Sequence, residues 1–405
     1  MNSSRPDLPL ATVSAPLVII IAAVRWDEVF ARNQQMARGL ALRGWDVLYV
    51  EPPVTWLAPL RRSSDRRHLR ITPQFRQIAV DARHTLRVLA PPTILPLGLR
   101  RRGLNRYNQR RLATAIAKVH RRPDALISYL PAAADLVPIL QPQVVIYDCA
   151  DDHAAFPGTH NPTLVRQLEA ELTRQSHSVF ATARSLADRL SQLRADVQLL
   201  PNAAEVEHFR QAETTEPHPL LRDIPQPRLG FIGGIGPWVD QAYIEALANL
   251  CPDCQLVLIG PTLTDVNRLR RRSNVHLLGP QPYADLPRFL AGFAAALFCF
   301  RASDLTEGVN PVKVYEYIAA GREVIATPNR ETSAFESLLW LARTPTEAAA
   351  ALRRILAGER RCSASARESF LAENSWKQRI DVMEASLFAR LASIHARRSP
   401  SQPPT

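Results

Sequence analysis

Hydrophobic and polar positions alternate along the chain in two different periods. Residues 17–24 are almost continuously apolar, which predicts a buried strand, and residues 29–42 carry apolar side chains at helical spacing. Residues 46–51 form a second apolar run that ends at Pro52. A strand, a helix and a strand within about 35 residues predict a βαβ unit, with a parallel sheet and a right-handed crossover.

The same alternation fills the rest of the first half and returns in the second half. Further strands are predicted at 125–129, 144–147, 178–181 and 197–200, with helices at 104–120, 164–175 and 185–193. A stretch rich in Pro and Glu at 212–227 lacks apolar periodicity, which predicts an interdomain linker. The alternation restarts at Leu229 and runs to Ala342. The chain is therefore predicted to be an α/β protein with two Rossmann-like, doubly wound domains, at 15–211 and 228–375.

A charged pair lies within an apolar segment of the second predicted domain. Pro311 suits the first position of a helix and Gly321 suits the position just beyond its end, which predicts a helix over 311–320. Lys313 and Glu316 are three positions apart on one face of this helix. The helix follows a predicted strand, and doubly wound sheets bind ligands at the carboxyl ends of their strands. An ordinary surface salt bridge is the alternative interpretation of the pair.

Glycines connect the strand that begins at Leu229 to the next predicted helix. Gly233 and Gly234 would let the backbone approach a phosphate, while the N-terminus of the following helix directs N–H groups toward it. A tight turn without a ligand is the alternative interpretation.

Acidic residues follow the predicted strand 144–147. Asp151 and Asp152 belong to the segment Asp-Cys-Ala-Asp-Asp-His at 148–153. We expect them to face the cleft between the domains, because acids with shifted pKa values gather at functional sites. Capping of the next helix and metal binding are the alternative roles for these acids.

Segments of the second predicted domain resemble the GT-B glycosyltransferases of the large retaining group called family 4, or glycosyl transferases group 1. The resemblance is carried by the Asn-Pro segment at 308–321 and by the strand-to-loop segments at 229–235, 256–261 and 274–279. It covers most of 227–330, and the first half more loosely. It implies a GT-B fold with two domains facing a central cleft, and a final helix at 376–396 that returns to the first domain.

The resemblance also implies roles in binding the donor. Glu316 matches a glutamate that binds the ribose hydroxyls of the nucleotide, and a carboxylate can accept two hydrogen bonds from such a diol. The other implied donor-binding residues are Gly233, Gly234, Leu278, Gly279, Tyr283, Arg301, Asn310, Pro311 and Lys313. Two features depart from the family pattern. Eight residues, instead of the usual seven, separate Glu307 from Glu316. Trp238 and Asp240 also stand where the glycine loop usually has basic residues. Other cations must therefore neutralise the diphosphate, and the candidates are Arg301, Lys313 and, more weakly, Arg184.

The first predicted domain supplies the remaining site residues by the same resemblance. Asp151 and Asp152 match the loop that faces the reacting sugar, and with Lys313 they are the predicted catalytic residues. Arg25, Trp26, Asp27 and Gln34 lie where the first strand meets the first helix, on the predicted acceptor side. A structural tryptophan packed on the interdomain surface is the alternative for Trp26.

Composition narrows the class of protein. The 405 residues are 46% hydrophobic and 22% charged, as in globular proteins long enough for two domains. The longest apolar runs, at 15–24 and 289–300, are shorter than the roughly 20 residues that span a bilayer, and no signal cleavage site follows the first. Residues 1–14 and 397–405 lack periodicity and are predicted to be disordered. Five cysteines, an odd number, fit a reducing cytoplasm, and the Cys251–Cys254 pair lacks further ligands for a metal. We expect neither metal nor cofactor, because helix dipoles and basic side chains can stabilise the leaving diphosphate.

The net charge is +12, the excess is arginine, and basic clusters occur in the first half, at 61–70 and 100–111. They predict contact with an anionic membrane surface or an acidic, lipid-linked acceptor. Solvated helix faces are the alternative, and no recognised pattern for binding nucleic acid accompanies the clusters.

Together with the resemblance, these features predict a glycosyltransferase of the hexosyltransferase type (EC 2.4) that transfers sugar from a nucleotide-sugar to the hydroxyl of a glycan or lipid-linked acceptor. The resemblance alone implies retention of configuration and a role in cell-envelope or exopolysaccharide synthesis. The expected location is cytoplasmic, peripheral to the inner face of the membrane. A nucleotide-sugar epimerase, a non-catalytic nucleotide-binding relative and a basic nucleic-acid binder are the alternatives.

Overall fold

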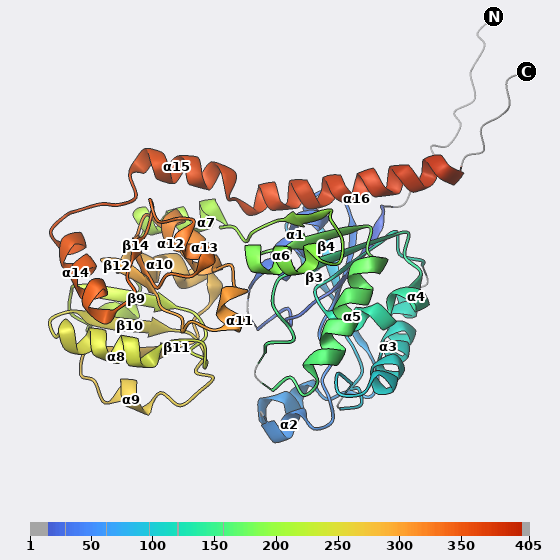
Figure 1. Cartoon of the computed structure of the whole chain (residues 1–405), viewed down its shortest axis with the longest axis horizontal. Helices are drawn as coiled ribbons and strands as arrows, with labels where there is room; N and C mark the ends of the chain where they lie inside the picture. The colour runs from blue at the N-terminus through green and yellow to red at the C-terminus, as the bar shows by residue number, and fades with distance from the viewer. Residues whose placement is uncertain are drawn as a thin grey trace, which may run out of the picture.

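Two parallel sheets, each covered by helices, form the two lobes of the computed structural model (Figure 1). The structure describes residues 15–398, apart from positions 29, 62, 97, 120 and 157. The predicted tail at 1–14 lies outside the described residues, as does 399–405. The α/β architecture with doubly wound parallel sheets confirms the predicted fold class.

The first sheet has eight strands in the order β3-β4-β2-β1-β5-β6-β7-β8, parallel except for the β3–β4 pair. Its strands are β1 (Leu17–Ile21), β2 (Asp46–Val50), β3 (Gln74–Ala79), β4 (Thr85–Ala90), β5 (Ala125–Ser128), β6 (Val144–Cys149), β7 (Ser178–Ala181) and β8 (Val197–Leu199). All five residues of β1 are buried, because helices cover both faces of the sheet. The helices of this lobe are α1 (Arg32–Leu42), α2 (Ala58–Arg61), α3 (Arg102–Ile116), α4 (Val137–Leu140), α5 (Pro162–Gln175) and α6 (Arg184–Ser191), with 3-10 turns η1 (Ser63–His68), η2 (Ala117–Val119) and η3 (Pro131–Asp135).

The second sheet has six parallel strands in the order β11-β10-β9-β12-β13-β14. They are β9 (Arg228–Ile232), β10 (Gln255–Ile259), β11 (Val275–Gly279), β12 (Ala295–Phe298), β13 (Glu323–Ala326) and β14 (Trp340–Leu341). Its helices are α7 (Val206–Arg210), α8 (Gln241–Leu250), α9 (Asn267–Arg270), α10 (Leu286–Ala291), α11 (Asp304–Glu307), α12 (Val312–Ala319), α13 (Arg330–Ser333), α14 (Pro345–Leu356) and α15 (Ala364–Glu373), with 3-10 turns η4 (Gln211–Glu213), η5 (Pro219–Leu221) and η6 (Tyr283–Asp285). Gly230 in β9 lets the Phe293 ring pack directly on the strand, since a Cβ there would lie 1.9 Å from the ring.

The chain passes between the lobes earlier than the sequence predicts. Ala203 packs in the core of the first lobe and Ala204 in the core of the second. The predicted linker 212–227 instead belongs to the second lobe, where Leu221 is buried in the core and its carbonyl accepts a hydrogen bond from the buried Arg228 guanidinium. Its polar composition conceals this role because its apolar side chains are few and irregularly spaced.

The final helix returns to the first lobe, as Figure 1 shows for α16 (Trp376–Arg398). Trp376, Met383 and Leu387 on this helix are buried in the core of the first lobe. The helix extends two residues into the predicted tail at 397–405, through Arg398. Within the described part of the chain, none of the helices has both the length and the apolar character needed to cross a membrane.

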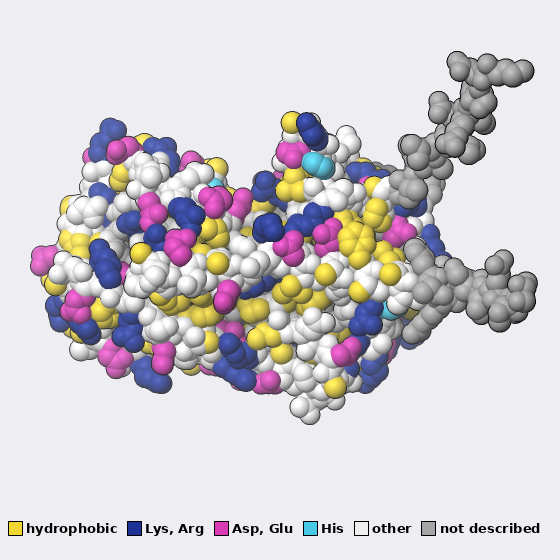
Figure 2. Space-filling view, turned by 90° about the horizontal axis from the view of Figure 1, so that it is seen from above, with side chains coloured by type: hydrophobic (Ala, Val, Ile, Leu, Met, Phe, Trp, Pro, Cys, Tyr) yellow, Lys and Arg dark blue, Asp and Glu magenta, His cyan; other side chains and the backbone are white. Residues whose placement is uncertain are grey.

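The lobes meet through the N-terminal end of α6. The Arg184 backbone N–H donates to Glu331 of α13 at 2.8 Å, and the Ser185 hydroxyl donates to the Glu307 carbonyl at 2.8 Å. Seen from above, the surface is hollowed between the lobes at the upper edge of Figure 2. The predicted site residues come from loops that lead toward this junction.

Candidate active site

The Lys313–Glu316 pair lies on α12, the helix that the sequence predicts over 311–320. The helix begins at Val312, with Pro311 as its N-cap residue. Lys313 Nζ lies 2.6 Å from Glu316 Oε2. Glu316 is 3% exposed, so the pair differs from the ordinary surface salt bridge considered from sequence. Among the described residues, no protein group donates a hydrogen bond to the second carboxylate oxygen.

Burial raises the pKa of Glu316, and the Lys313 ammonium opposes this shift. The energetic reason is that a carboxylate removed from water loses its hydration, which one lysine restores only in part. A ligand with two hydroxyl groups would supply the missing hydrogen bonds.

Aromatic rings lie near this carboxylate. The His208 and Tyr283 rings stack, with centroids 4.7 Å apart and an interplanar angle of 13°, and His208 Nε2 lies 3.0 Å from the Tyr283 carbonyl oxygen. The ring of Phe30 from the first lobe also packs against Tyr283, with ring centroids 4.9 Å apart. The sequence pattern indicates Tyr283 but not Phe30, because an isolated aromatic residue before α1 gives no sign that it reaches the other lobe.

The Trp238 side chain packs on the glycine loop after β9, whereas the sequence predicts a loop whose backbone could approach a phosphate. The Trp238 indole N–H donates to the Gly234 carbonyl at 3.2 Å, and a Cβ on Gly236 would lie 2.6 Å from the Trp238 ring. The Gly233 N–H donates to the Ile259 carbonyl. At the start of α8, the Asp240 carboxylate accepts from the Tyr243 N–H. Thus a carboxylate already caps the helix end to which the predicted phosphate would bind, and Trp238 would have to move to open the loop.

Leu278 and Gly279 end β11 beside this loop. The Gly279 carbonyl accepts from the Gly260 N–H, and the Leu278 carbonyl accepts from the Gln281 amide. Gly279 has φ +69°, a conformation that favours glycine. The role of both residues in binding the donor, where the resemblance places them beside the nucleotide base, stays a prediction.

Asn310 joins the two lobes. Its Oδ1 accepts from the Asn202 N–H at 2.9 Å, and its Nδ2 donates to Glu331 Oε2 at 3.0 Å and to Tyr315 Oη at 3.1 Å. Because the side chain is buried and its polar atoms are engaged, we correct its predicted role from donor contact to interdomain contact.

Arg301 is the exposed cation of this region. Its backbone N–H donates to the Trp238 carbonyl, but its guanidinium has no ion pair or hydrogen bond among the described residues. A free guanidinium at the carboxyl end of β12 is suited to a diphosphate. Arg184, the weaker candidate, instead pairs with Glu331 at 3.3 Å.

The two predicted catalytic acids have opposite environments. Burial raises the pKa of Asp151 to about 6. Burial would also raise the pKa of Asp152, but the Arg166 guanidinium, 2.5 Å from its Oδ2, lowers the pKa overall. Asp152 also accepts from the Ala154 N–H at 3.1 Å, and a Cβ on Gly308 of the second lobe would lie 3.6 Å from the Asp152 Cβ. Asp152 therefore holds the loop in place, and Asp151 is the better candidate for proton transfer.

We expect Asp151→Asn and Asp152→Asn to change stability with opposite dependence on pH. The pKa of Asp151 is raised from 3.8 to about 6, so wild-type stability falls as pH rises through that window and Asp151→Asn should be more stable at pH 7.5 by about 1–3 kcal/mol. The pKa of Asp152 is lowered, so Asp152→Asn should be less stable at neutral pH, with the difference fading as pH falls below 3.8. Urea unfolding at pH 3 and 7.5 measures both differences; equal profiles for the two variants would contradict the assignment.

The acceptor-side predictions divide into cavity and scaffold residues. Arg25 NH1 lies 2.5 Å from Glu28 Oε1, and Arg25 lines a cavity in the first lobe. Asp27 pairs with Arg76 at 2.5 Å on the surface. The Trp26 ring packs edge-on against Tyr49 with centroids 5.0 Å apart, as in the structural alternative.

Gln34 also differs from its predicted role. It is fully buried, and its Nε2 donates to the Arg25 carbonyl while its Oε1 accepts from the Ala31 N–H. It therefore fixes the loop before α1 and does not face the acceptor.

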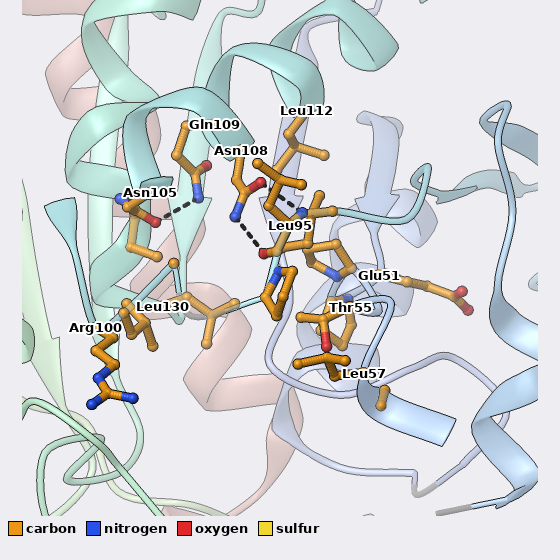
Figure 3. A pocket seen from close by; sticks show the side chains of 18 of the residues that line it. Glu51, Thr55, Leu57, Leu95, Arg100, Asn105, Asn108, Gln109, Leu112 and Leu130 are labelled. Atoms are coloured by element: carbon orange, nitrogen blue, oxygen red, sulfur yellow. Dashed lines mark hydrogen bonds between the residues drawn. The ribbon is translucent and has the colours of Figure 1, made fainter. Parts of the chain in front are cut away.

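The cavity of the first lobe has a volume of about 820 Å³ and lies beyond the carboxyl ends of β1 and β2 (Figure 3). Its walls include Glu51 at the end of β2, Leu130 after β5, and residues of α3, among them Asn108 and Gln109. Asn108 holds one wall in place, because its amide bonds both the N–H and the carbonyl of Leu95 (Figure 3). The sequence pattern does not indicate these residues, because the polar positions of α3 have the spacing of a solvated helix face.

Comparisons with known proteins agree with this architecture. Residues 240–385 match the family described as glycosyl transferase-like. The chain is 24% identical over 356 residues to TuaH of Bacillus subtilis (strain 168), described as a teichuronic acid biosynthesis glycosyltransferase; the match covers 80% of this chain and 84% of that protein.

Solved structures share the fold over nearly their whole length. An α,α-trehalose 6-phosphate synthase from Burkholderia multivorans superposes with a TM-score of 0.67 at 13% identity, covering 95% of this chain and all of that chain. Anabaena Alr3699/HepE, in complex with UDP and glucose, gives a TM-score of 0.61 at 14% identity over 93% of this chain and 99% of that chain. The chain therefore has the GT-B fold of these glycosyltransferases, and residues 240–385, most of its second lobe, match the glycosyl transferase-like family.

Proposed function

We propose that this protein is a retaining hexosyltransferase of the family 4 type. It transfers a sugar from a nucleotide-sugar donor, held by the second lobe, to a hydroxyl of an acceptor held by the first. The observation that carries the proposal is the Glu316 carboxylate: it is buried next to the junction of the lobes, and one of its oxygens has no protein donor among the described residues. A ribose diol supplies such donors.

The remaining donor groups are assigned by charge. Arg301, which is exposed and has no ion pair among the described residues, binds the diphosphate. Lys313 Nζ lies 2.6 Å from Glu316 Oε2 and can donate hydrogen bonds both to this carboxylate and to the diphosphate. No metal is needed in this proposal, because fixed cations stabilise the charge that develops on the leaving diphosphate. The bound Anabaena HepE structure, with UDP and glucose, supports a nucleotide-sugar donor for this fold.

The reaction requires no covalent nucleophile from the chain. The acceptor hydroxyl attacks the sugar from the face that the diphosphate leaves, and the configuration is retained. Asp151, whose pKa of about 6 is set by burial, receives or relays the hydroxyl proton near neutral pH. Closure of the lobes excludes water and limits hydrolysis of the donor.

The pathway assignment is cell-envelope or exopolysaccharide synthesis. It is supported by the teichuronic acid assignment of the Bacillus relative. The acceptor is a glycan or a lipid-linked molecule, and the protein acts in the cytoplasm at the inner face of the membrane.

A thermal-shift panel of nucleoside diphosphates and their sugar conjugates tests the donor assignment. We expect one nucleotide series to raise the melting temperature, because a ligand at about 100 times its Kd stabilises the folded state by about 2.7 kcal/mol. Absence of any shift across the panel would contradict the proposal. Incubation with the stabilising donor alone then separates the alternatives: an epimerase converts the sugar without an acceptor, whereas a transferase leaves it unchanged apart from slow hydrolysis.

A further inference from the structure

We propose that the cavity of the first lobe binds the acceptor as an anionic amphiphile presented by a membrane. Its apolar chain would lie against α2 and Leu99, its phosphate near Arg100, and its hydroxyl-bearing head near Gln109. This inference rests on the proposed function, because it identifies the class of acceptor for the same reaction.

The size and lining of the cavity suit such a molecule. Pockets of about 300–1,000 Å³ with mostly apolar walls and a few polar groups are usual for small ligands. This cavity holds about 820 Å³, and Leu95, Leu112 and Leu130 contribute apolar walls around the polar positions of α3 (Figure 3). A purely polar glycan would leave these apolar walls without partners.

Gln109 in the cavity wall carries a buried polar atom without a partner among the described residues. Gln109 is 7% exposed and its Nε2 donates to Asn105 Oδ1 at 3.4 Å, whereas none of the described groups donates a hydrogen bond to its Oε1. An unsatisfied buried carbonyl costs about 1–3 kcal/mol, which a donor from a ligand would recover. Because protein atoms cover this oxygen, the Gln109 side chain must turn toward the cavity before a hydroxyl group of the acceptor head can donate to it.

The mouth of the cavity is apolar and cationic. Leu57 and Leu60 of the α2 segment are 47% and 82% exposed, and Leu99 is 41% exposed; all three line the cavity. Trp56, next to Leu57, is also exposed. The Arg100 guanidinium lines the same mouth and has no ion pair or hydrogen bond among the described residues. Apolar side chains beside unpaired arginine complement the boundary between acyl chains and anionic headgroups.

The cavity is also connected to the candidate acid. Thr159 lines the cavity, and its hydroxyl donates to the carbonyl of His153, two residues after Asp151. The segment that starts with Asp151 therefore forms part of the cavity wall. An acceptor bound in the cavity would reach the loop that carries the proton-transfer group.

Flotation of the full chain with vesicles tests the membrane contact. We expect binding to vesicles of equimolar phosphatidylcholine and phosphatidylglycerol and weak binding to phosphatidylcholine alone. Leu57→Ser combined with Leu60→Ser should weaken binding roughly tenfold, and Arg100→Glu about fivefold. The matched control replaces two exposed leucines of the second lobe, Leu220→Ser with Leu356→Ser. This double variant should bind the vesicles as tightly as wild type does.

Thermal shifts with a soluble probe test the cavity itself. Dihexanoyl phosphatidylglycerol should raise the melting temperature, glycerol 3-phosphate should not, and Gln109→Met should reduce the shift. Equal binding by the leucine variants, equal loss in the control, or displacement from vesicles by a single-stranded oligonucleotide would overturn the proposal. The thermal shift caused by UDP-glucose and other donors is measured on the same variants. If wild type shows no such shift, the proposed function is wrong. If wild type shows the donor shift but does not bind vesicles, only the proposal of a membrane acceptor is wrong.

Discussion

Glu316→Gln should weaken binding of the nucleotide-sugar by roughly 10- to 100-fold and reduce transfer by at least as much, because a hydrogen bond to a charged group contributes about 1.5–3 kcal/mol. The amide keeps the shape of the side chain but loses the charge that pairs with Lys313 Nζ at 2.6 Å. It also replaces one acceptor oxygen with a donor, which opposes the ribose hydroxyls. Donor affinity from ligand-induced thermal shifts, together with initial rates, measures both effects.

Glu323→Gln provides the matched control. Glu323 is another buried glutamate of the second lobe, but its Oε2 accepts from the Trp340 indole at 2.6 Å and from the Arg361 N–H at 3.0 Å, so its role lies in the fold. This variant should melt at a lower temperature and keep its donor affinity. If Glu316→Gln shows the same pattern, the Lys313 pair is structural and the donor assignment is wrong.

The sequence predicts elements well where burial is continuous. The strands β1, β9 and β12 are runs of apolar residues between polar segments, and a parallel sheet covered on both faces requires that pattern. The helix α12 was also predictable, because Pro311 and Gly321 mark its two ends. For the same reason the position of Glu316 at the carboxyl side of the second sheet follows from the sequence.

Elements at the edge of the first sheet do not follow from the sequence. β3 is an exposed edge strand with alternating polar residues such as Gln74 and Arg76, so no apolar run marks it. The segment of α2 exposes Leu57 and Leu60, whose apolar character resembles that of buried residues. The cavity beside α2 is formed by segments from several parts of the chain, and local patterns carry no information about such contacts.

Side-chain orientation explains the two corrected assignments. Asn310 and Gln34 are residue types that contact ligands and also satisfy buried backbone groups. Their positions in the sequence fit either role. Only the tertiary contacts decide between the roles. Asn310 accepts a hydrogen bond from Asn202 in the other lobe, and Gln34 donates one to the Arg25 carbonyl.

A buried ion pair fixes the start of α1 to the end of β6. Arg32 Nε lies 2.8 Å from Asp148 Oδ2 and its NH2 lies 2.9 Å from Oδ1, while NH1 donates to the Pro201 carbonyl at 3.2 Å. The Arg32 side chain is 4% exposed, and the Asp148 side chain is fully buried. Burial alone would lower the pKa of the Arg32 guanidinium, but the Asp148 carboxylate outweighs this effect, so the pKa is raised overall. The pair therefore holds α1, the acid-bearing strand and the first crossover between the lobes in one arrangement.

Asp148→Ala should lower the free energy of unfolding by about 3–5 kcal/mol, because it leaves the Arg32 guanidinium buried without its counter-charge. Urea unfolding followed by circular dichroism measures the loss. Combining Asp148→Leu with Arg32→Met should recover most of it, since an apolar pair needs no hydration and fills similar volume. The control is Glu359→Gln at the exposed pair with Arg354, which should leave the unfolding curve unchanged. A small loss in Asp148→Ala would show that water reaches Arg32 and that the junction is looser than its distances indicate.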